Sequence, residues 1–316
     1  MEGTLTCWDG RRITLPQVRG WTFQYGQGTP CDSFTLTCLW EPEDDMLAQA
    51  VTFTATEGGQ TVFTGVVDEC ERGWDEKGGF LTVSGRSMAA RLLDNEALGM
   101  DYQVATWEDI LRDHVTPYGV QAVPGAKLSA VPGFSVALGS SEWQVVYEFC
   151  RYYGGITPRF DRLGRLVATP WEAGKRLVLG EDAAVIALTL RDQRYGVLSE
   201  ILVRDRTDGR VQSVQNEDFC SRGGMSRRVL TMPGKSSYQT MRYSGEYQLA
   251  QSAQELRQLE LELPGAFLAW PGDLVEVRLS QPVGRGLWRV AEAVSGMDEK
   301  GTYTRLVLGG TDVLGR

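Results

Sequence analysis

The stretch Gly73-Trp-Asp-Glu-Lys-Gly-Gly-Phe80 returns near the C-terminus as Gly296-Met-Asp-Glu-Lys-Gly-Thr-Tyr303. The offset of 298 − 75 = 223 positions also pairs Val67 with Val290 and Glu69 with Glu292. Each copy follows the order strand, polar turn bounded by Gly, strand, which predicts a β-hairpin whose Gly residues take positive φ. Two interpretations stay open. Either Asp-Glu-Lys-Gly is a good turn that occurs twice by chance, or one β-domain is used twice in the chain.

The regions around the two hairpins are rich in predicted strands. Residues 51–55 and 61–67 flank a Gly-Gly turn, and short strands at this spacing favour a sandwich or a barrel. We therefore divide the chain into a first β-domain (1–97), an α/β insertion (98–172) and a second β-domain (173–316). Within the last domain, residues 217–258 are predicted to be an irregular loop followed by a helix over 248–259.

Helix-start signals place three helices between the two hairpins. A short helix is expected after Ser87, which we take as its cap. Thr106 opens a second helix with a variant capping box, and Ser141 opens a third with a better capping box. The predicted class is mainly β with an α/β insertion.

Composition excludes several classes of function. Formal charge is 32 − 41 = −9, which argues against a general affinity for nucleic acid or anionic membranes. No apolar run reaches the ~18 residues of a membrane span, and the first residues lack the pattern of a signal peptide. We expect a protein that is made and folded in the cytosol, with no membrane anchor. The six Cys are expected to be buried thiols, with a Cys31–Cys38 disulfide as the alternative.

Signals for catalysis are weak. His114 is the only histidine, and it is either a base or metal ligand or a packed helix residue, which is the reading we prefer. Residues 41–45 form an acidic loop that could hold a metal but is more simply solvated. We find no Gly-rich phosphate loop and no nucleophile elbow. No catalytic, cofactor-binding or metal-binding residue is therefore predicted.

Two other functions need different residues. A peptidoglycan hydrolase would need paired carboxylates, for which Glu69, Asp75, Glu292 and Asp298 are the candidates, although all flank turns. A carbohydrate- or receptor-binding protein would use exposed aromatic rings, with Trp8, Trp21 and Trp74 as candidates, although Trp residues more often pack in a core or an interface.

Several stretches together suggest a family. They are Phe63-Thr-Gly-Val-Val67, Val83-Ser-Gly-Arg86, Pro117-Tyr-Gly-Val120, Ser141-Glu-Trp143, Asp161-Arg-Leu-Gly-Arg-Leu166 and Pro271-Gly-Asp-Leu-Val-Glu-Val277. In their order and spacing these stretches resemble baseplate hub proteins of contractile phage tails and related injection systems, including the Mu-type tail protein, the late-control D group and the hubs of Gram-positive prophages. The resemblance covers nearly the whole chain, and its motifs are structural rather than catalytic.

The resemblance implies two tube-like β-barrel domains per chain and a homotrimer that forms a pseudo-sixfold ring. Such a hub is a virion structural protein that joins the hexameric tail tube, or a tube-initiator protein, to the trimeric central spike. Tape measure and baseplate wedge proteins are further expected partners, and the particle is a phage, a tailocin or another injection system. The predicted interface residues are the hairpin tips and a basic segment, namely Asp75, Glu76, Lys77, Asp298, Glu299, Lys300, Arg222, Arg227 and Arg228.

Overall fold

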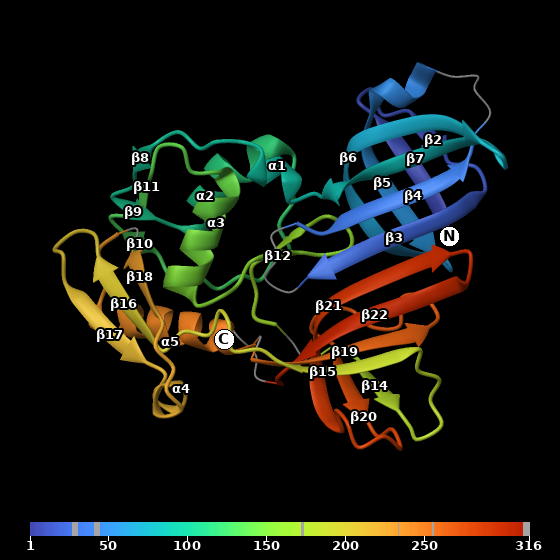
Figure 1. The fold of residues 1–316 in the computed structure, drawn as a ribbon. Helices are drawn as coiled ribbons and strands as arrows, with labels where there is room; N and C mark the ends of the chain where they lie inside the picture. The colour runs from blue at the N-terminus through green and yellow to red at the C-terminus, as the bar shows by residue number, and fades with distance from the viewer. Residues whose placement is uncertain (27–30, 41–44, 172–173, 233, 255, 312–316) are drawn as a thin grey trace.

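A computed structural model describes residues 1–26, 31–40, 45–171, 174–232, 234–254 and 256–311. Thirteen strands from the two ends of the chain form one large sheet, and a helical unit lies between them in the sequence (Figure 1). The predicted mainly β class with an α/β insertion is confirmed. Within the described residues, no helix is both long and apolar enough to span a membrane.

The first β region contains the N-terminal strands of the large sheet. They follow the order β3-β4-β7-β6-β5-β1-β2, and every neighbouring pair is antiparallel. A short 3-10 helix, η1 (Asp45–Gln49), precedes β5. The strands are β1 (Glu2–Cys7), β2 (Arg12–Thr14), β3 (Val18–Gly26), β4 (Ser33–Leu39), β5 (Ala50–Glu57), β6 (Gln60–Asp75) and β7 (Gly78–Ser87).

The second β region repeats this strand order. Its strands follow the order β15-β19-β22-β21-β20-β14, so that β15 corresponds to β3, β19 to β4, β20 to β5, β21 to β6 and β22 to β7. One difference is that β14 runs parallel to β20, whereas β1 runs antiparallel to β5. The strands are β14 (Arg176–Leu179), β15 (Ala187–Asp192), β19 (Arg257–Pro264), β20 (Leu274–Val277), β21 (Gly286–Asp298) and β22 (Gly301–Gly309).

Both long strands carry a bulge at the equivalent place. In β6 the register with β7 shifts between Val67 and Glu69, and in β21 the register with β22 shifts between Val290 and Glu292. A bulge bends a strand and increases its twist. Before the bulge β21 pairs with β20, and after it β21 pairs with β3 of the first region. The β3–β21 ladder therefore joins the two regions, and the two strands lie side by side in Figure 1.

One hydrophobic core serves both β regions. In the first region the rings of Phe23, Phe34 and Phe53 stack and the ring of Phe63 packs against them at a tilt, and in the second region leucines such as Leu259, Leu261 and Leu306 fill the core. Phe23 lies 5.8 Å, centroid to centroid, from the ring of Phe267 in the second region. Among the cysteines, Cys31 and Cys38 are both free thiols, so the alternative of a disulfide is wrong.

The α/β insertion has its own core around Phe134, Phe149 and Leu166. Thr106 caps α2 with a full capping box, because its side chain accepts from the Asp109 amide and the Asp109 carboxylate accepts from the Thr106 amide. At α3 the Ser141 hydroxyl accepts from the Gln144 amide, but no reciprocal bond completes a capping box. The better capping box is therefore at α2, and the expected ranking of the two is reversed. The elements are α1 (Ala90–Leu93), β8 (Met100–Asp101), β9 (Val104–Ala105), α2 (Trp107–His114), η2 (Thr116–Tyr118), β10 (Val131–Pro132), β11 (Ser135–Val136), α3 (Glu142–Glu148), the π-helix η3 (Phe149–Tyr153), β12 (Arg159–Phe160) and β13 (Leu166–Val167).

Ser87 does not cap α1, contrary to the prediction. It ends β7, and its hydroxyl accepts a hydrogen bond from the Asp32 amide, whereas Ala89 occupies the cap position without a side-chain bond. The strand therefore continues further than expected before the helix begins.

Residues 217–258 were predicted to be an irregular loop followed by a late helix, and the structure differs from this prediction. They contribute to a separate unit in which the three-stranded sheet β17-β16-β18 packs against α5, with a small core around Ile201, Val203 and Met241. Strand β18 pairs in parallel with β16, and the helix begins at Tyr238, ten residues before the predicted start at 248. The elements are β16 (Glu200–Asp205), β17 (Val211–Gln215), α4 (Glu217–Ser221), β18 (Arg227–Met232) and α5 (Tyr238–Gln254).

Candidate interface site

The two repeated turns have the same local geometry. Lys77 N donates to Asp75 Oδ1 at 2.8 Å, and Lys300 N donates to Asp298 Oδ1 at 2.8 Å. The Gly that follows each Lys has positive φ, 109° for Gly78 and 117° for Gly301. These torsions are open to Gly and disfavoured for other residues, so the Asp-Glu-Lys-Gly sequence accounts for the shape of both tips.

A second glycine in each hairpin lets an aromatic ring lie across the sheet. Gly73 is paired with Phe80, and Gly296 with Tyr303. A Cβ atom on Gly73 would lie 2.4 Å from the Phe80 ring, and one on Gly296 would lie 2.3 Å from the Tyr303 ring. The match between the copies therefore extends beyond the turn and supports duplication rather than chance.

The two tips contact each other within one chain, which the sequence analysis missed. Lys77 Nζ lies 3.0 Å from Glu299 Oε1, so an ion pair links the tip of β6–β7 to the tip of β21–β22. Arg19 of β3 adds an ion pair with Asp75 at 3.0 Å. The tips form one exposed polar surface beside the β3–β21 ladder.

The electrostatics of the tip carboxylates do not suit acid catalysis. Hydrogen bonding from Arg19 lowers the pKa of Asp75, whereas a glycosidase acid needs a raised pKa. Glu69, Glu292 and Asp298 are also solvent-exposed. The hydrolase alternative therefore gains no support from this geometry.

The predicted basic segment lies in a different unit from the tips, so the structure does not bring the two sets together (Figure 1). Arg222 lies just after α4, and its Nε donates to the Asp218 carbonyl at 3.2 Å. Arg227 forms an ion pair with Glu200, and Arg228 is exposed on β18. Part of the positive charge is thus neutralised locally.

His114 lies in a buried hydrogen-bond network. Its Nδ1 is 2.6 Å from Glu142 Oε2, and its Nε2 is 3.0 Å from the Tyr102 hydroxyl. The Tyr118 hydroxyl donates to Glu142 Oε1 at 2.5 Å. The network joins α2 to α3, and both His114 and Glu142 are almost fully buried. This placement fits the preferred interpretation of a packed helix residue.

The tryptophans divide into two groups. Trp21 is buried, with 7% of its surface exposed, whereas Trp8 and Trp74 are 73% and 78% exposed. Trp74 stands at the tip end of β6. Of the three candidates for a receptor-binding surface, Trp21 is thus part of the core.

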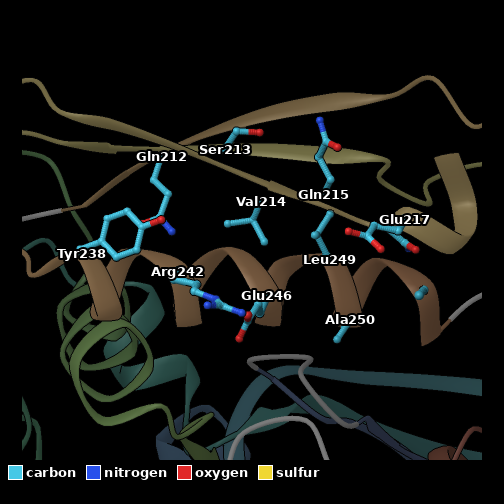
Figure 2. A pocket seen from close by; sticks show the side chains of 12 residues that line it. Gln212, Ser213, Val214, Gln215, Glu217, Tyr238, Arg242, Glu246, Leu249 and Ala250 are labelled. Atoms are coloured by element: carbon cyan, nitrogen blue, oxygen red, sulfur yellow. The ribbon is translucent and has the colours of Figure 1, made fainter.

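The structure contains a groove of about 610 Å³ between β17 and α5 (Figure 2). Gln212 and Gln215 project from the strand, and Arg242 and Glu246 project from the helix. The two charged groups pair with each other at 2.7 Å, and no reactive set of side chains converges there.

A second cavity, of about 390 Å³, lies between the two β regions and the insertion. Tyr25, Asp32, Arg159 and Trp270 line it. Burial raises the pKa of Asp32 to about 7, and its Oδ1 accepts from the Gly26 amide at 3.0 Å.

The described part of the chain offers His, Cys, Asp and Glu side chains as potential metal ligands. No group of three or more His, Cys, Asp or Glu side chains there is arranged to hold a metal ion. Residues 41–44 of the acidic loop lie outside the described residues, so that prediction is not tested.

No protein-family model matches the chain. A similar sequence is the baseplate hub protein gp44 of Escherichia phage Mu, with 28% identity over 190 residues. The alignment spans 58% of this chain and 49% of gp44, which is about half the length of the phage protein.

Solved structures extend the likeness to the whole chain. The tail protein from Neisseria meningitidis MC58 has a TM-score of 0.79 and 17% identity, with 99% of this chain and 97% of that chain covered. The 43 kDa tail protein of prophage MuSo2 from Shewanella oneidensis has a TM-score of 0.74 and 18% identity, with 100% and 99% covered. The chain thus has a tail-protein fold, and its expected resemblance to baseplate hub proteins is confirmed. The three relatives are named as a baseplate hub protein and two tail proteins.

Proposed function

We propose that this chain is the structural hub of a tail baseplate, in which three copies form a pseudo-sixfold ring. The ring joins the hexameric tail tube, or a tube-initiator protein, on one face to the trimeric central spike on the other and leaves a central channel. The sequence similarity to a Mu baseplate hub protein supports the role.

The observation that carries the proposal is the repeated strand order of the two β regions. A sixfold surface can be matched by three chains only if each chain supplies two similar patches. The shared hairpin register, the bulge position and the Asp–Lys hydrogen bond of each turn support this idea, because they make the two hairpins of the chain alike. The two regions are the candidates for the two tube-like barrel domains.

Net charge suits a channel through which nucleic acid passes. Three chains carry 3 × −9 = −27 formal charges, and like charges repel the phosphate backbone. We place the assembled hub in the baseplate of a phage or phage-like particle, after synthesis in the bacterial cytoplasm. Tape measure and wedge proteins are further proposed contacts.

Coexpression with the spike and tube proteins of the same particle tests this role. Native mass spectrometry should find three copies of this chain bound to one spike trimer, and electron microscopy should show a ring with six similar lobes. A complex with one or six copies, or no complex with either partner, would overturn the proposal.

Tip replacement gives a second test. Substitution of Asp75-Glu76-Lys77 or Asp298-Glu299-Lys300 by Gly-Ser linkers should reduce ring formation more than it reduces the melting temperature of the isolated chain, because the tips are exposed and lie at the edge of the sheet. Unchanged ring yield would contradict an interface role for the tips. The matched control is a Gly-Ser replacement of the exposed turn Thr207-Asp208, which lies in the separate unit of β16–β18.

A further inference from the structure

Two strand edges of this chain are open at places where their structural equivalents are paired. After its bulge, β6 pairs with β7 on one side, and among the described residues no backbone hydrogen bond reaches its other side from Glu69 to Trp74. In the same described set, β15 pairs with β19 alone. Open edges present unpaired amides and carbonyls that can accept another strand.

The equivalent edges show what such a strand would be. The strand equivalent to β6 is β21, and the strand equivalent to β15 is β3. These two pair with each other inside the chain, antiparallel, from Glu292 opposite Gly26 to Met297 opposite Trp21. One of the two equivalent junctions is therefore closed within the chain, and both halves of the other are exposed.

We propose that β6 of one copy pairs antiparallel with β15 of the next copy, in the register of the β3–β21 ladder. This inference rests on the proposed ring and identifies the contact that closes it. A head-to-tail contact of this kind joins two different surfaces of the same chain, and it forms a ring when its rotation closes.

The internal repeat fixes the expected register. The position of β6 follows from the offset 296 − 73 = 223, as set by the hairpin registers. The position of β15 follows from two neighbouring ladders. Strand β4 lies between β3 and β7, and its equivalent β19 lies between β15 and β22, so the registers of these ladders match Thr22 of β3 with Thr189 of β15, an offset of 189 − 22 = 167. Transfer of the β3–β21 pairs then places Glu71 opposite Arg191, Arg72 opposite Leu190 and Trp74 opposite Leu188 of the next copy.

Side chains fit this register on both faces of the ladder. Glu71 and Arg191 carry opposite charges and would lie directly across from each other, which stabilises a strand pair. On the other face, Arg72 would lie diagonal to Asp192 of the next copy. The same face would bring the exposed ring of Trp74 against the half-buried Leu188, as Met297 lies across from Trp21 within the chain.

The hairpin tips follow the same rule. Within the chain, Lys77 of the first tip pairs with Glu299 of the second. Transfer by the repeat pairs Glu76 of one copy with Lys300 of the next. The repeated Glu-Lys sequence supplies both partners, so each tip in the ring can contact the next one. Exposed ion pairs add little stability, and their role here is to match one tip to the other.

Disulfide trapping tests the register. In a Cys70→Ala, Cys220→Ser background, the pair Glu71→Cys with Arg191→Cys places thiols at directly opposite positions, whose Cα atoms would be about 4.5–5.5 Å apart. Oxidation during coexpression with the spike protein should give covalent dimers and trimers on a non-reducing gel. Glu71→Cys with Thr189→Cys, two residues out of register, should give at least tenfold less. Val294→Cys with Gln24→Cys is the internal equivalent and should close within a single chain.

The outcomes separate this inference from the proposed function. A threefold complex with the spike that lacks the 71–191 cross-link, or that cross-links equally at 71–189, overturns the strand pairing and leaves the hub role standing. Failure to bind the spike or tube, with the internal 24–294 disulfide formed and the chain folded, overturns the hub role and the ring contact together.

Charge reversal gives an independent readout. Glu71→Arg and Arg191→Glu should each lower the ring fraction several-fold, because each places like charges opposite one another at all junctions between copies, and Arg191→Glu also removes the ion pair that Arg191 forms with Glu260 at 2.8 Å within the chain. The double variant should recover most of the ring. Equal loss in the single and double variants would count against the proposed pairing.

Discussion

The first and second β regions share strand order, hairpin register and bulge position, yet they differ in how their edges are covered. Strand β3 is buried between β4 and β21, and it presents Trp21, Phe23 and Tyr25 to the core. Its equivalent β15 pairs on one side only, and it presents the half-buried Leu188 and Leu190. The contrast shows that residue size at equivalent positions follows how completely each strand is enclosed.

The regions also differ in their connections. Between β15 and β19 the chain inserts the whole β16–α5 unit, whereas β3 and β4 are separated by residues 27–32 alone. The reversed direction of β14 relative to β1 is a second difference. Both regions keep the strand pairings of the long hairpin, β6–β7 in the first region and β21–β22 in the second, and of its neighbouring strands. They differ at the outer strand, β1 or β14, and in the connection between β15 and β19.

The largest expected difference between equivalent positions is at Phe23 and Leu190. Phe23→Ala should lower the free energy of unfolding by about 3–5 kcal/mol, because the ring is fully buried against Phe34, Phe53 and Phe63. Leu190→Ala should cost about 1 kcal/mol in the isolated chain, since its edge is open. Guanidinium unfolding followed by near-UV circular dichroism measures both. Equal costs would show that the β15 edge is already covered in the single chain.

A smaller difference is expected at Gly85, whose equivalent in the second region is Leu308 at 85 + 223. A Cβ atom on Gly85 would lie 2.0 Å from the Val66 carbonyl oxygen, so the β6 and β7 backbones approach more closely there than a side chain permits. Gly85→Ala should cost about 1–3 kcal/mol through this overpacking.

Thermal unfolding of Gly85→Ala measures the cost at this position. Gly180→Ala is the control, because nothing lies within 4 Å of its added Cβ. If the two variants melt together, the close approach of the strands is not required in solution.

Asp32 tests an electrostatic difference between the regions. It lies just before β4. Thr37 of β4 is equivalent to Glu262 of β19, an offset of 262 − 37 = 225, so the position equivalent to Asp32 is Arg257. Burial raises the pKa of Asp32 to about 7, above its unfolded value of about 3.9. The folded chain therefore binds an extra proton between these values, so this group's contribution is fully present below about pH 4 and is lost as pH rises towards 7.

Asp32→Asn should remove that pH dependence and keep an acceptor for the Gly26 amide. At pH 8 the variant should be more stable than the natural chain by on the order of 4 kcal/mol, and at pH 4 the difference should nearly vanish. Urea unfolding across this range measures it. Asp9→Asn is the control, because hydrogen bonds from Arg11 lower the pKa of Asp9 and its effect falls at lower pH. A constant difference between pH 4 and 8 would contradict a raised pKa.

The sequence predicted the features that depend on local backbone geometry. The Gly residues of both tips and the Thr106–Asp109 capping box are each specified within a few residues, and all are present. Outside the turns, the equivalence between strands of the two β regions could not be recognised from the amino-acid sequence. Phe34 of β4, for example, is replaced by Leu259 of β19, and both residues are buried. Burial conserves apolar character but not identity, so the repeat is visible in pairing and faint in sequence.

Residues 217–232 were misread for a related reason. Strand β18 pairs in parallel with β16 across more than twenty residues, so no hairpin turn marks it. Only its later positions face the small core, and Arg227 and Arg228 make the segment look like a solvated loop. The contact between the Lys77 and Glu299 tips is likewise nonlocal and follows from the β3–β21 ladder.

The smallest expected effect concerns those tips and sharpens the comparison most. Lys77→Ala should change the stability of the isolated chain by less than about 1 kcal/mol, because its ion pair with Glu299 is solvent-exposed. Lys300→Ala should change it less still, since in the single chain its proposed partner belongs to the next copy. In the assembled ring Lys300→Ala should lower the salt concentration at which the ring dissociates, whereas Lys77→Ala should leave it nearly unchanged, because the Lys77–Glu299 pair lies within one chain and is not broken when the copies separate. Ring dissociation followed by mass photometry at rising salt measures this, because screening weakens exposed pairs. If Lys300→Ala dissociates at the same salt concentration as the natural chain, or if Lys77→Ala weakens the ring as much as Lys300→Ala does, the duplication of the turn has no counterpart between copies.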